Sequence, residues 1–158
     1  MSASPRRSAL LLGIAGLSLG AVGAALATQH LMGMEPCPWC ILQRLIFVTI
    51  ALAALLGLLL GRMFAGLLVL ALSACGIAAA LWQHFVAAAS DSCNLTLAEK
   101  IISGLGLDGS LPEIFQPRAS CADAAVKLLG VPYEFWSLAL FVLTGLLALR
   151  LLARPRRG

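Results

Sequence analysis

Charged residues are scarce in this chain. Only 11% of its 158 residues are Asp, Glu, Lys or Arg, whereas 61% are hydrophobic and the mean hydropathy is +0.98. A soluble domain of this size carries about 25% charged residues. The composition therefore excludes that class and indicates an integral membrane protein. The chain is too short for a large extramembrane domain, and we expect a single membrane domain over residues 1–158.

The residue pattern of a structural zinc site is also missing. Such a site usually adds a second close pair of cysteines to the first, or histidines at ligand spacing. The chain has only two histidines, and Cys93 and Cys121 lie 28 positions apart. We therefore expect no metal. There is also no internal repeat or low-complexity tract.

Four uncharged or nearly uncharged stretches are present instead. They cover residues 8–28, 41–61, 64–82 and 135–153, and each approaches or exceeds the roughly 20 residues that cross a hydrocarbon core. Lipid tolerates only helices or closed barrels, and Gly and Ala let neighbouring helices approach closely. The sequence predicts an all-α bundle of four transmembrane helices in a lipid bilayer.

The basic residues predict the orientation of this bundle. Seven of the 11 lie on one side: Arg6, Arg7, Arg62, Arg150, Arg154, Arg156 and Arg157. All seven acids lie on the other: Glu35, Asp91, Glu99, Asp108, Glu113, Asp123 and Glu134. By the positive-inside rule both termini are cytoplasmic, and the tryptophans cluster at the outer ends of the spans. The net charge of +4 is a topology signal, and we expect no nucleic-acid partner.

The first span has a rival interpretation as a cleavable signal peptide, with Arg6 and Arg7 as its charged region and Ala25-Leu26-Ala27 as its cleavage site. The apolar stretch exceeds the 7 to 15 residues usual for such a region. Cleavage would also leave only three spans. The sequence favours a retained helix.

Two loops join the spans on the predicted outer face, over residues 29–40 and 87–134. In the long loop, the apolar pattern of residues 95–107 fits a short amphipathic helix, which lies on the membrane surface or packs on the bundle. Glycines and prolines then interrupt the pattern, and we expect an irregular, mobile stretch up to Cys121.

Two pairs of cysteines lie in these loops. One is Cys37-Pro38-Trp39-Cys40, and the other is Cys93 with Cys121. A two-residue spacer suits a redox dithiol, and a second pair supplies an exchange partner. Two static disulfides in an oxidising compartment are the alternative. A soluble thioredoxin-type motif would follow a strand, whereas this one abuts a span. The fifth cysteine, Cys75, is expected to be a small buried apolar side chain within the third span.

Arg44 lies four residues after Cys40 and hence on the same face of the second span. Prolines bracket Cys37, so regular helix is expected to begin near Trp39 or Cys40. The helix N-terminus and the guanidinium should both favour the Cys40 thiolate. Arg44 also suits a bound anionic or carbonyl group, although an arginine at a helix end can simply snorkel to the headgroups.

His84 ends the third span at the predicted outer interface. A histidine there can shuttle protons or hydrogen-bond the carbonyl oxygen of a ligand. A polar cap at the water boundary is the plainer alternative.

Taken together, these features resemble the disulfide bond formation protein B (DsbB) family. The resemblance rests on the four spans, Cys37-Pro-Trp-Cys40, Arg44, and the cysteines at 93 and 121, and it covers nearly the whole chain. It implies a bacterial inner-membrane oxidoreductase that reoxidises a periplasmic DsbA-like thiol oxidase. Electrons then pass to the membrane quinone pool, with ubiquinone or menaquinone as the acceptor.

The resemblance also implies a role for each cysteine. Cys93 would form the mixed disulfide with DsbA, Cys121 would be its partner, and Cys37 would relay between the pairs. Cys40 would contact the quinone beside Arg44, with His84 close by. Some members carry a tryptophan shortly after the fourth cysteine. Here that neighbourhood reads Ala124-Ala125-Val126, and Trp39 or Trp136 is the available substitute.

Two rival functions remain. A vitamin K epoxide reductase-like enzyme also uses four spans, quinone and two cysteine pairs, but in that family the close pair follows the loop pair, and the order here is reversed. The other rival is a membrane metal-binding or scaffold protein whose cysteines are ligands or staples. Redox cycling of the cysteines that depends on the respiratory chain distinguishes the oxidase from this second rival.

Overall fold

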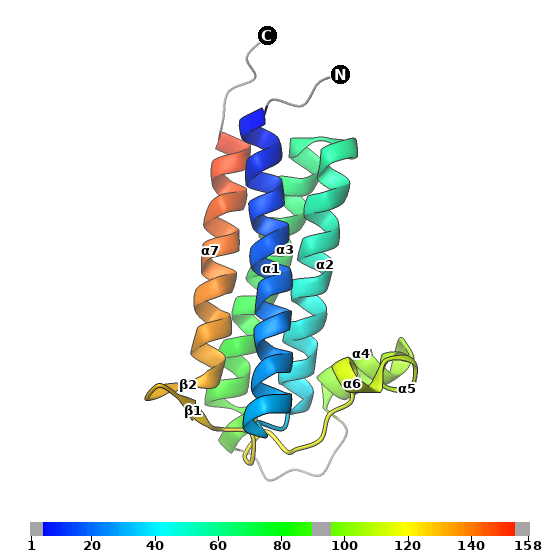
Figure 1. The fold of residues 1–158 in the computed structure, drawn as a ribbon, viewed down its shortest axis with the longest axis vertical. Coiled ribbons are helices and arrows are strands. Elements are labelled where there is room, and N and C mark those ends of the chain that lie inside the picture. Colours follow the sequence, from blue (N-terminus) through cyan, green and yellow to red (C-terminus); the bar gives the residue numbers. More distant parts are fainter. Residues whose placement is uncertain (1–4, 90–95, 154–158) are drawn as a thin grey trace.

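The structure is a computed structural model that describes residues 5–89 and 96–153. Four long helices lie side by side in it: α1 (Pro5–Met32), α2 (Pro38–Leu60), α3 (Arg62–Phe85) and α7 (Tyr133–Ala153) (Figure 1). All four are long and apolar enough to cross a membrane. The predicted four-helix membrane bundle is confirmed, with each helix a few residues longer than its predicted span.

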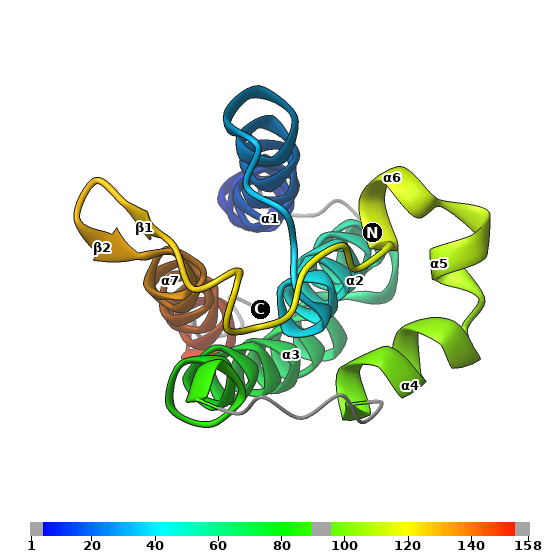
Figure 2. The ribbon, with the colours of Figure 1, turned by 90° about the horizontal axis from the view of Figure 1, so that it is seen from below.

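The two ends of the bundle differ in what they carry. Helix α1 begins and α7 ends at one end, where α2 turns into α3 through Gly61 (Figure 1). The loop elements gather at the opposite end, next to Cys37 and Cys40 (Figures 1 and 2). Gly61 has φ of +103°, a backbone conformation that residues other than glycine rarely adopt. The fold therefore separates a cysteine-bearing end from an end with a tight turn.

Helix α4 (Leu97–Gly104) lies within the stretch of the long loop where an amphipathic helix was predicted. Thr96 and Glu99 form a capping box at its start, which satisfies backbone N–H groups that the first turn leaves unpaired. Ala98 and Ile102 are fully buried, and α4 packs against α2. The side of its apolar face that carries Ala98 and Ile102 therefore packs on the bundle.

The rest of the long loop holds more structure than the glycines and prolines suggested. A 3-10 turn, η1 (Ala87–Ala89), follows α3. Two single-turn helices follow α4, namely α5 (Leu107–Ser110) and α6 (Pro112–Phe115). Strands β1 (Lys127–Leu128) and β2 (Val131–Pro132) then pair antiparallel just before α7. The irregular stretch between α6 and β1 crosses the end of the bundle (Figure 2).

Small residues let α3 approach its neighbours closely. A Cβ atom added at Gly76 would lie 2.4 Å from the ring of Phe141 on α7. That ring is stacked on Phe47 of α2, with centroids 4.0 Å apart. Ser73 and Thr144 hydrogen-bond across the same interface at 3.0 Å. Glycine at position 76 therefore allows three helices to meet around one aromatic pair.

Replacing Gly76 with alanine should destabilise the bundle. The added methyl group overlaps the Phe141 ring, and overpacking of this kind costs about 1 to 3 kcal/mol. Gly20→Ala is the matched control, because a Cβ there meets nothing within 4 Å. Thermal unfolding in detergent should show a lower midpoint for Gly76→Ala only. Equal midpoints for the two variants would contradict the described contact between α3 and α7.

Candidate functional site

Cys37 and Cys40 are held together by the start of helix α2. Cys37 is the N-cap residue, and its sulfur accepts a hydrogen bond from the Cys40 backbone N–H at 3.3 Å. Pro38 occupies the first helical position, where the missing N–H is not needed. The two sulfurs are 2.8 Å apart. The helix thus begins one or two residues earlier than predicted, and its first turn places the pair in position to form a disulfide.

Cys121 is brought to the same place from the far part of the chain. The backbone N–H groups of Arg118 and Ala119 both donate to the Pro36 carbonyl oxygen, at 3.0 and 3.3 Å. The Cys121 sulfur then receives the Trp39 backbone N–H and hydrogen-bonds with Cys37. Cysteines 84 positions apart in the sequence therefore touch at one end of the bundle.

Cys37 and Cys121 are polarised in opposite directions by this contact. Burial, followed by the hydrogen bond with Cys121, raises the pKa of the Cys37 thiol. The hydrogen bond with Cys37 lowers the pKa of Cys121 and outweighs the opposing effect of burial, and the Trp39 backbone N–H lowers this pKa further. The proton is therefore held on Cys37, and Cys121 is the better thiolate. The thiolate is the form that attacks disulfides.

This contact predicts a disulfide between Cys37 and Cys121. In a Cys40→Ser/Cys93→Ser variant, mild oxidation with diamide should link the two, as read by mass spectrometry of unreduced peptides. The rate of linkage should rise with pH and level off at a lower pH than it would for an ordinary cysteine, because the lowered pKa makes Cys121 a thiolate at lower pH. Cys75 remains in this variant as an internal control. Linkage to Cys75 would contradict the geometry. A rate of linkage that levels off only at the pH where an ordinary cysteine becomes a thiolate would also contradict it.

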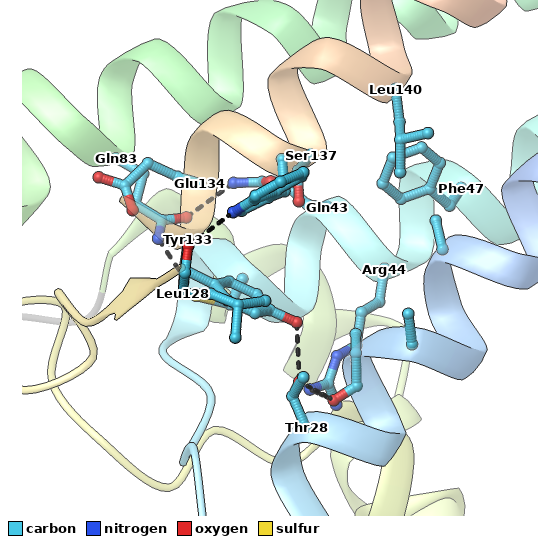
Figure 3. A pocket seen from close by; sticks show the side chains of 15 residues that line it. Thr28, Gln43, Arg44, Phe47, Gln83, Leu128, Tyr133, Glu134, Ser137 and Leu140 are labelled. Carbon is cyan, nitrogen blue, oxygen red and sulfur yellow. Dashed lines mark hydrogen bonds between the residues drawn. The ribbon is translucent and has the colours of Figure 1, made fainter. Parts of the chain in front are cut away.

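A cavity of about 210 Å³ opens beside Cys40, between α1, α2, α3 and α7 (Figure 3). Its walls are largely apolar, with alanines of α1, Phe47 of α2 and Leu140 of α7. Polar groups from several elements also reach it: Thr28, Cys40, Gln43, Arg44, Gln83, Tyr133, Glu134 and Ser137. Apolar walls with a few convergent polar groups are typical of a ligand site.

Arg44 lines this cavity and is 5% exposed. Its guanidinium donates to the Gln29 side-chain oxygen at 2.8 Å, to the Ile114 carbonyl at 3.0 Å and to the Ala25 carbonyl at 3.4 Å. These contacts tie α2 to α1 and to α6. Arg44 and Cys40 thus line the same cavity, while the hydrogen bonds of the guanidinium go to oxygens and not to the sulfur.

Besides Cys37, the side chain of Gln83 contacts the Cys40 sulfur: its Nε2 donates a hydrogen bond to this sulfur at 3.2 Å. Gln43 in turn donates to the Gln83 oxygen at 2.7 Å, which leaves the Gln83 nitrogen to face the sulfur. Both glutamines are buried. Our sequence reasoning gave neither a role. The signal was available for Gln43, which lies three residues after Cys40 and so on the same helical face.

His84 does not line the cavity, but it contacts a residue that does. Its Nδ1 lies 2.5 Å from an oxygen of Glu134, and Glu134 lies in the first turn of α7 and faces the cavity (Figure 3). Glu134 is 4% exposed. Sequence reasoning treated this acid only as a marker of topology, because nothing in the local pattern distinguishes a buried glutamate from an interfacial one.

The remaining candidates fall in different places. Cys93 lies outside the described residues. Trp136 lines the cavity and donates to the Leu128 carbonyl at 3.3 Å, whereas Trp39 packs on Trp82 with centroids 6.2 Å apart.

Cys75 is exposed on the outside of α3, so the prediction of a buried side chain is wrong. It fails because the buried face of α3 runs through Ser73 and Gly76, which turns position 75 outward.

The fold and the site define a multi-pass membrane protein with a redox-capable dithiol at the end of one span, a third cysteine in contact with it and a cavity of about 210 Å³ beside it. Comparison with known proteins identifies the family. A family model described as Disulfide bond formation protein DsbB matches residues 6–151.

Proteins with similar sequences bear the name Disulfide bond formation protein B. The chain is 39% identical over 158 residues to Disulfide bond formation protein B of Pseudomonas syringae pv. tomato, covering 96% of this chain and 92% of the relative. Its identity to the Aromatoleum aromaticum protein of that name is 36% over 158 residues, 95% of each chain. The Ralstonia nicotianae protein is 32% identical over 169 residues, 99% of this chain and all of the relative. The chain belongs to the DsbB family, whose members are disulfide oxidoreductases that act in disulfide bond formation.

Proposed function

We propose that this protein oxidises a periplasmic DsbA-like thiol oxidase and passes the electrons to a membrane quinone. The observation that carries the proposal is the continuous arrangement of Cys121, Cys37, Cys40 and the cavity. Cys121 touches Cys37, Cys37 touches Cys40, and Cys40 lines the cavity together with Arg44. Thiol chemistry at the loop is thereby connected to a site that a lipid-soluble acceptor can reach.

The steps balance as thiol–disulfide exchange. The reduced partner attacks a Cys93–Cys121 disulfide, leaves oxidised, and leaves Cys93 and Cys121 as thiols. The Cys121 thiolate then attacks a Cys37–Cys40 disulfide at Cys37, and Cys40 leaves as a thiolate. Cys93 attacks Cys121 in the resulting Cys121–Cys37 disulfide, which re-forms the Cys93–Cys121 disulfide and leaves Cys37 and Cys40 reduced. As Cys37 and Cys40 re-form their disulfide, they release two electrons and two protons. Each catalytic cycle moves one electron pair from the partner to the acceptor.

The residues around the cavity fit a quinone. Apolar walls from α1 and α7 suit a ring and an isoprenoid tail, and Arg44 supplies N–H donors for a carbonyl oxygen. A bound quinone supplies an acceptor for two electrons and two protons. DsbA has a reduction potential of about −120 mV, and the DsbA–DsbB–quinone relay keeps the bacterial periplasm oxidising. Only a more oxidising acceptor can reoxidise DsbA, and ordinary cysteine pairs alone do not meet that requirement. Ubiquinone and menaquinone are both candidates.

The orientation that this function needs follows from the charges. With the arginine-rich end cytoplasmic, the cysteine-bearing end faces the periplasm of a bacterial inner membrane. The partner then approaches the loop elements, and the quinone enters the cavity from the bilayer. We propose this placement together with the function, because neither works without the other.

A stoichiometry measurement tests the proposal. Purified protein is mixed with reduced DsbA and a short-chain ubiquinone, and quinone absorbance and partner thiols are followed together. One quinone should be consumed for each partner disulfide formed. Quinone loss without thiol loss, or thiol oxidation that proceeds equally well without quinone, would refute the coupling. A scaffold whose cysteines are static staples would show neither change.

A further inference from the structure

We propose that Glu134 and His84 form a proton path from the outer end of the bundle to the cavity, with Glu134 as the group that exchanges a proton with the ligand held there. This inference rests on the proposed quinone site. It assigns a catalytic role to a glutamate that sequence reasoning used only for topology. His84, which the family resemblance suggested as a ligand contact, becomes the residue that connects Glu134 to the surface.

The first observation is the state of the Glu134 carboxyl group. The residue is 4% exposed and lines the cavity. Its Oε2 atom is buried and has no hydrogen-bond partner among the described residues. A buried carboxyl oxygen without a partner is energetically unfavourable. In its protonated form the same oxygen can donate a hydrogen bond to a carbonyl oxygen. The cavity is where such an acceptor is expected to lie.

The second observation is the connection to the surface. The other oxygen of Glu134 lies 2.5 Å from His84 Nδ1. The side chain of His84 is 31% exposed, and its ring is flanked by Phe85 and Phe135, with centroids 4.8 and 4.6 Å away. An imidazole ring carries two nitrogens, of which one can accept a proton while the other gives one up. Here one imidazole touches both a buried carboxyl group and the surface of the protein.

Within residues 5–89 and 96–153, no other group that lines the cavity combines these properties. From α2, Cys40 and Arg44 face it, but Cys40 is the proposed electron donor and the Arg44 guanidinium stays charged. Tyr133 of α7 is paired with Thr28 of α1 at 2.9 Å. The lining glutamines do not titrate. Among the described residues that line the cavity, Glu134 carries the only carboxyl group.

The proton balance closes with this assignment. Formation of the Cys37–Cys40 disulfide releases two electrons and two protons, and reduction of a quinone to its hydroquinone takes up two of each. A proton that Glu134 gives to the ligand is replaced through His84 from the outer aqueous phase. An equal number of thiol protons leaves to that phase, so no net charge crosses the membrane.

Kinetics of a matched pair of variants test the path. Glu134→Gln keeps the size of the side chain and a hydrogen-bond donor but cannot pass a proton. Its kcat for quinone reduction should fall about 100-fold, a typical contribution of acid–base catalysis, while the dissociation constant for a quinone analogue stays within about threefold. Glu113→Gln is the control, since Glu113 is an exposed acid paired with Arg118 at 3.3 Å, and it should behave as wild type. Unchanged kcat in Glu134→Gln would overturn the inference.

The His84 end of the path has its own test. His84→Ala should slow quinone reduction, and added imidazole should restore the rate, because it can replace a proton carrier at a partly exposed position. A merely structural role for His84 would not respond to imidazole. This variant also keeps the proposal testable if Glu134→Gln fails to fold. Absence of rescue, in a variant that binds the quinone analogue normally, would overturn the path.

Chemical labelling supplies a readout that does not depend on activity. Dicyclohexylcarbodiimide reacts with protonated carboxyl groups in apolar surroundings, and peptide mass spectrometry should find it on Glu134 of the wild-type protein. A short-chain quinone should protect Glu134 from the reagent. Wild-type protein that reduces no quinone would refute the proposed function. Wild-type turnover without labelling of Glu134 would refute only the inference.

Discussion

Replacing Cys40 with serine is expected to abolish quinone reduction. Cys40 is the member of the close pair that lines the cavity, and its sulfur lies 2.8 Å from that of Cys37. A serine hydroxyl cannot form the disulfide that releases the electron pair. Turnover with reduced DsbA and quinone, measured by quinone absorbance, should fall to the rate without protein.

Two comparisons make this result specific. Cys75→Ser should retain full turnover, because Cys75 lies on the outside of α3 and away from the cavity. In the Cys40→Ser protein, the contact between Cys37 and Cys121 does not involve position 40, so thiol exchange at the loop pair should persist for a single turnover. Sustained turnover by Cys40→Ser would refute the assignment of Cys40 as the electron donor.

Arg44→Leu is expected to weaken the use of quinone without stopping thiol exchange. The guanidinium is the one permanently charged donor that the described part of the chain contributes to the cavity. A hydrogen bond from a charged group contributes about 1.5 to 3 kcal/mol, which corresponds to an increase in the quinone KM of about tenfold to a hundredfold. The rate at which the protein oxidises DsbA in a single turnover should stay within about twofold of wild type.

Arg118→Leu is the matched control for Arg44→Leu. It removes a positive charge at the same end of the bundle, but from a side chain that pairs with Glu113 outside the cavity. Its quinone KM should equal that of wild type. Because Arg44 also holds Gln29, α1 can shift in Arg44→Leu, so Gln29→Leu separates the two effects. If Gln29→Leu raises the KM as much as Arg44→Leu, Arg44 acts by positioning α1 and the direct contact is contradicted.

Much of the fold was predictable because the bilayer imposes strong rules. Uncharged stretches of about 20 residues leave few alternatives to spanning helices, and the four long helices follow the predicted spans closely. The place of Cys37 and Cys40 at the start of α2 followed from Pro36 and Pro38, since proline is confined to the beginning of a helix.

The contacts at the site depend on distant segments and could not be read from local patterns. Cys121 reaches Cys37 because two backbone N–H groups of the long loop bond to the Pro36 carbonyl, and no periodicity encodes that docking. Gln83 and Glu134 likewise become part of the cavity only when α3 and α7 pack against α2. For Cys75 the prediction of a buried side chain was wrong, because a small residue within a span gives no sign of which way it faces.

The hairpin before α7 was also unforeseen. Its strands have only two residues each, so the alternation that normally reveals a strand is too short to see. Gly130 has φ of +81° and Leu129 has φ of +55°, and their positive values allow the tight turn. Trp136 then bonds to the Leu128 carbonyl, which fixes the hairpin beside the cavity that both residues line.

Photolabelling with an azido derivative of a short-chain quinone tests most directly whether the acceptor binds beside Cys40. Mass spectrometry of the labelled peptides should place the label on residues 21–28, 40–47 and 133–140, the three segments that contribute most of the cavity wall. An excess of unmodified quinone during irradiation should prevent this labelling. Label confined to the opposite end of the bundle, around residues 57–66, or label that excess quinone leaves unchanged, would contradict a quinone site at this cavity.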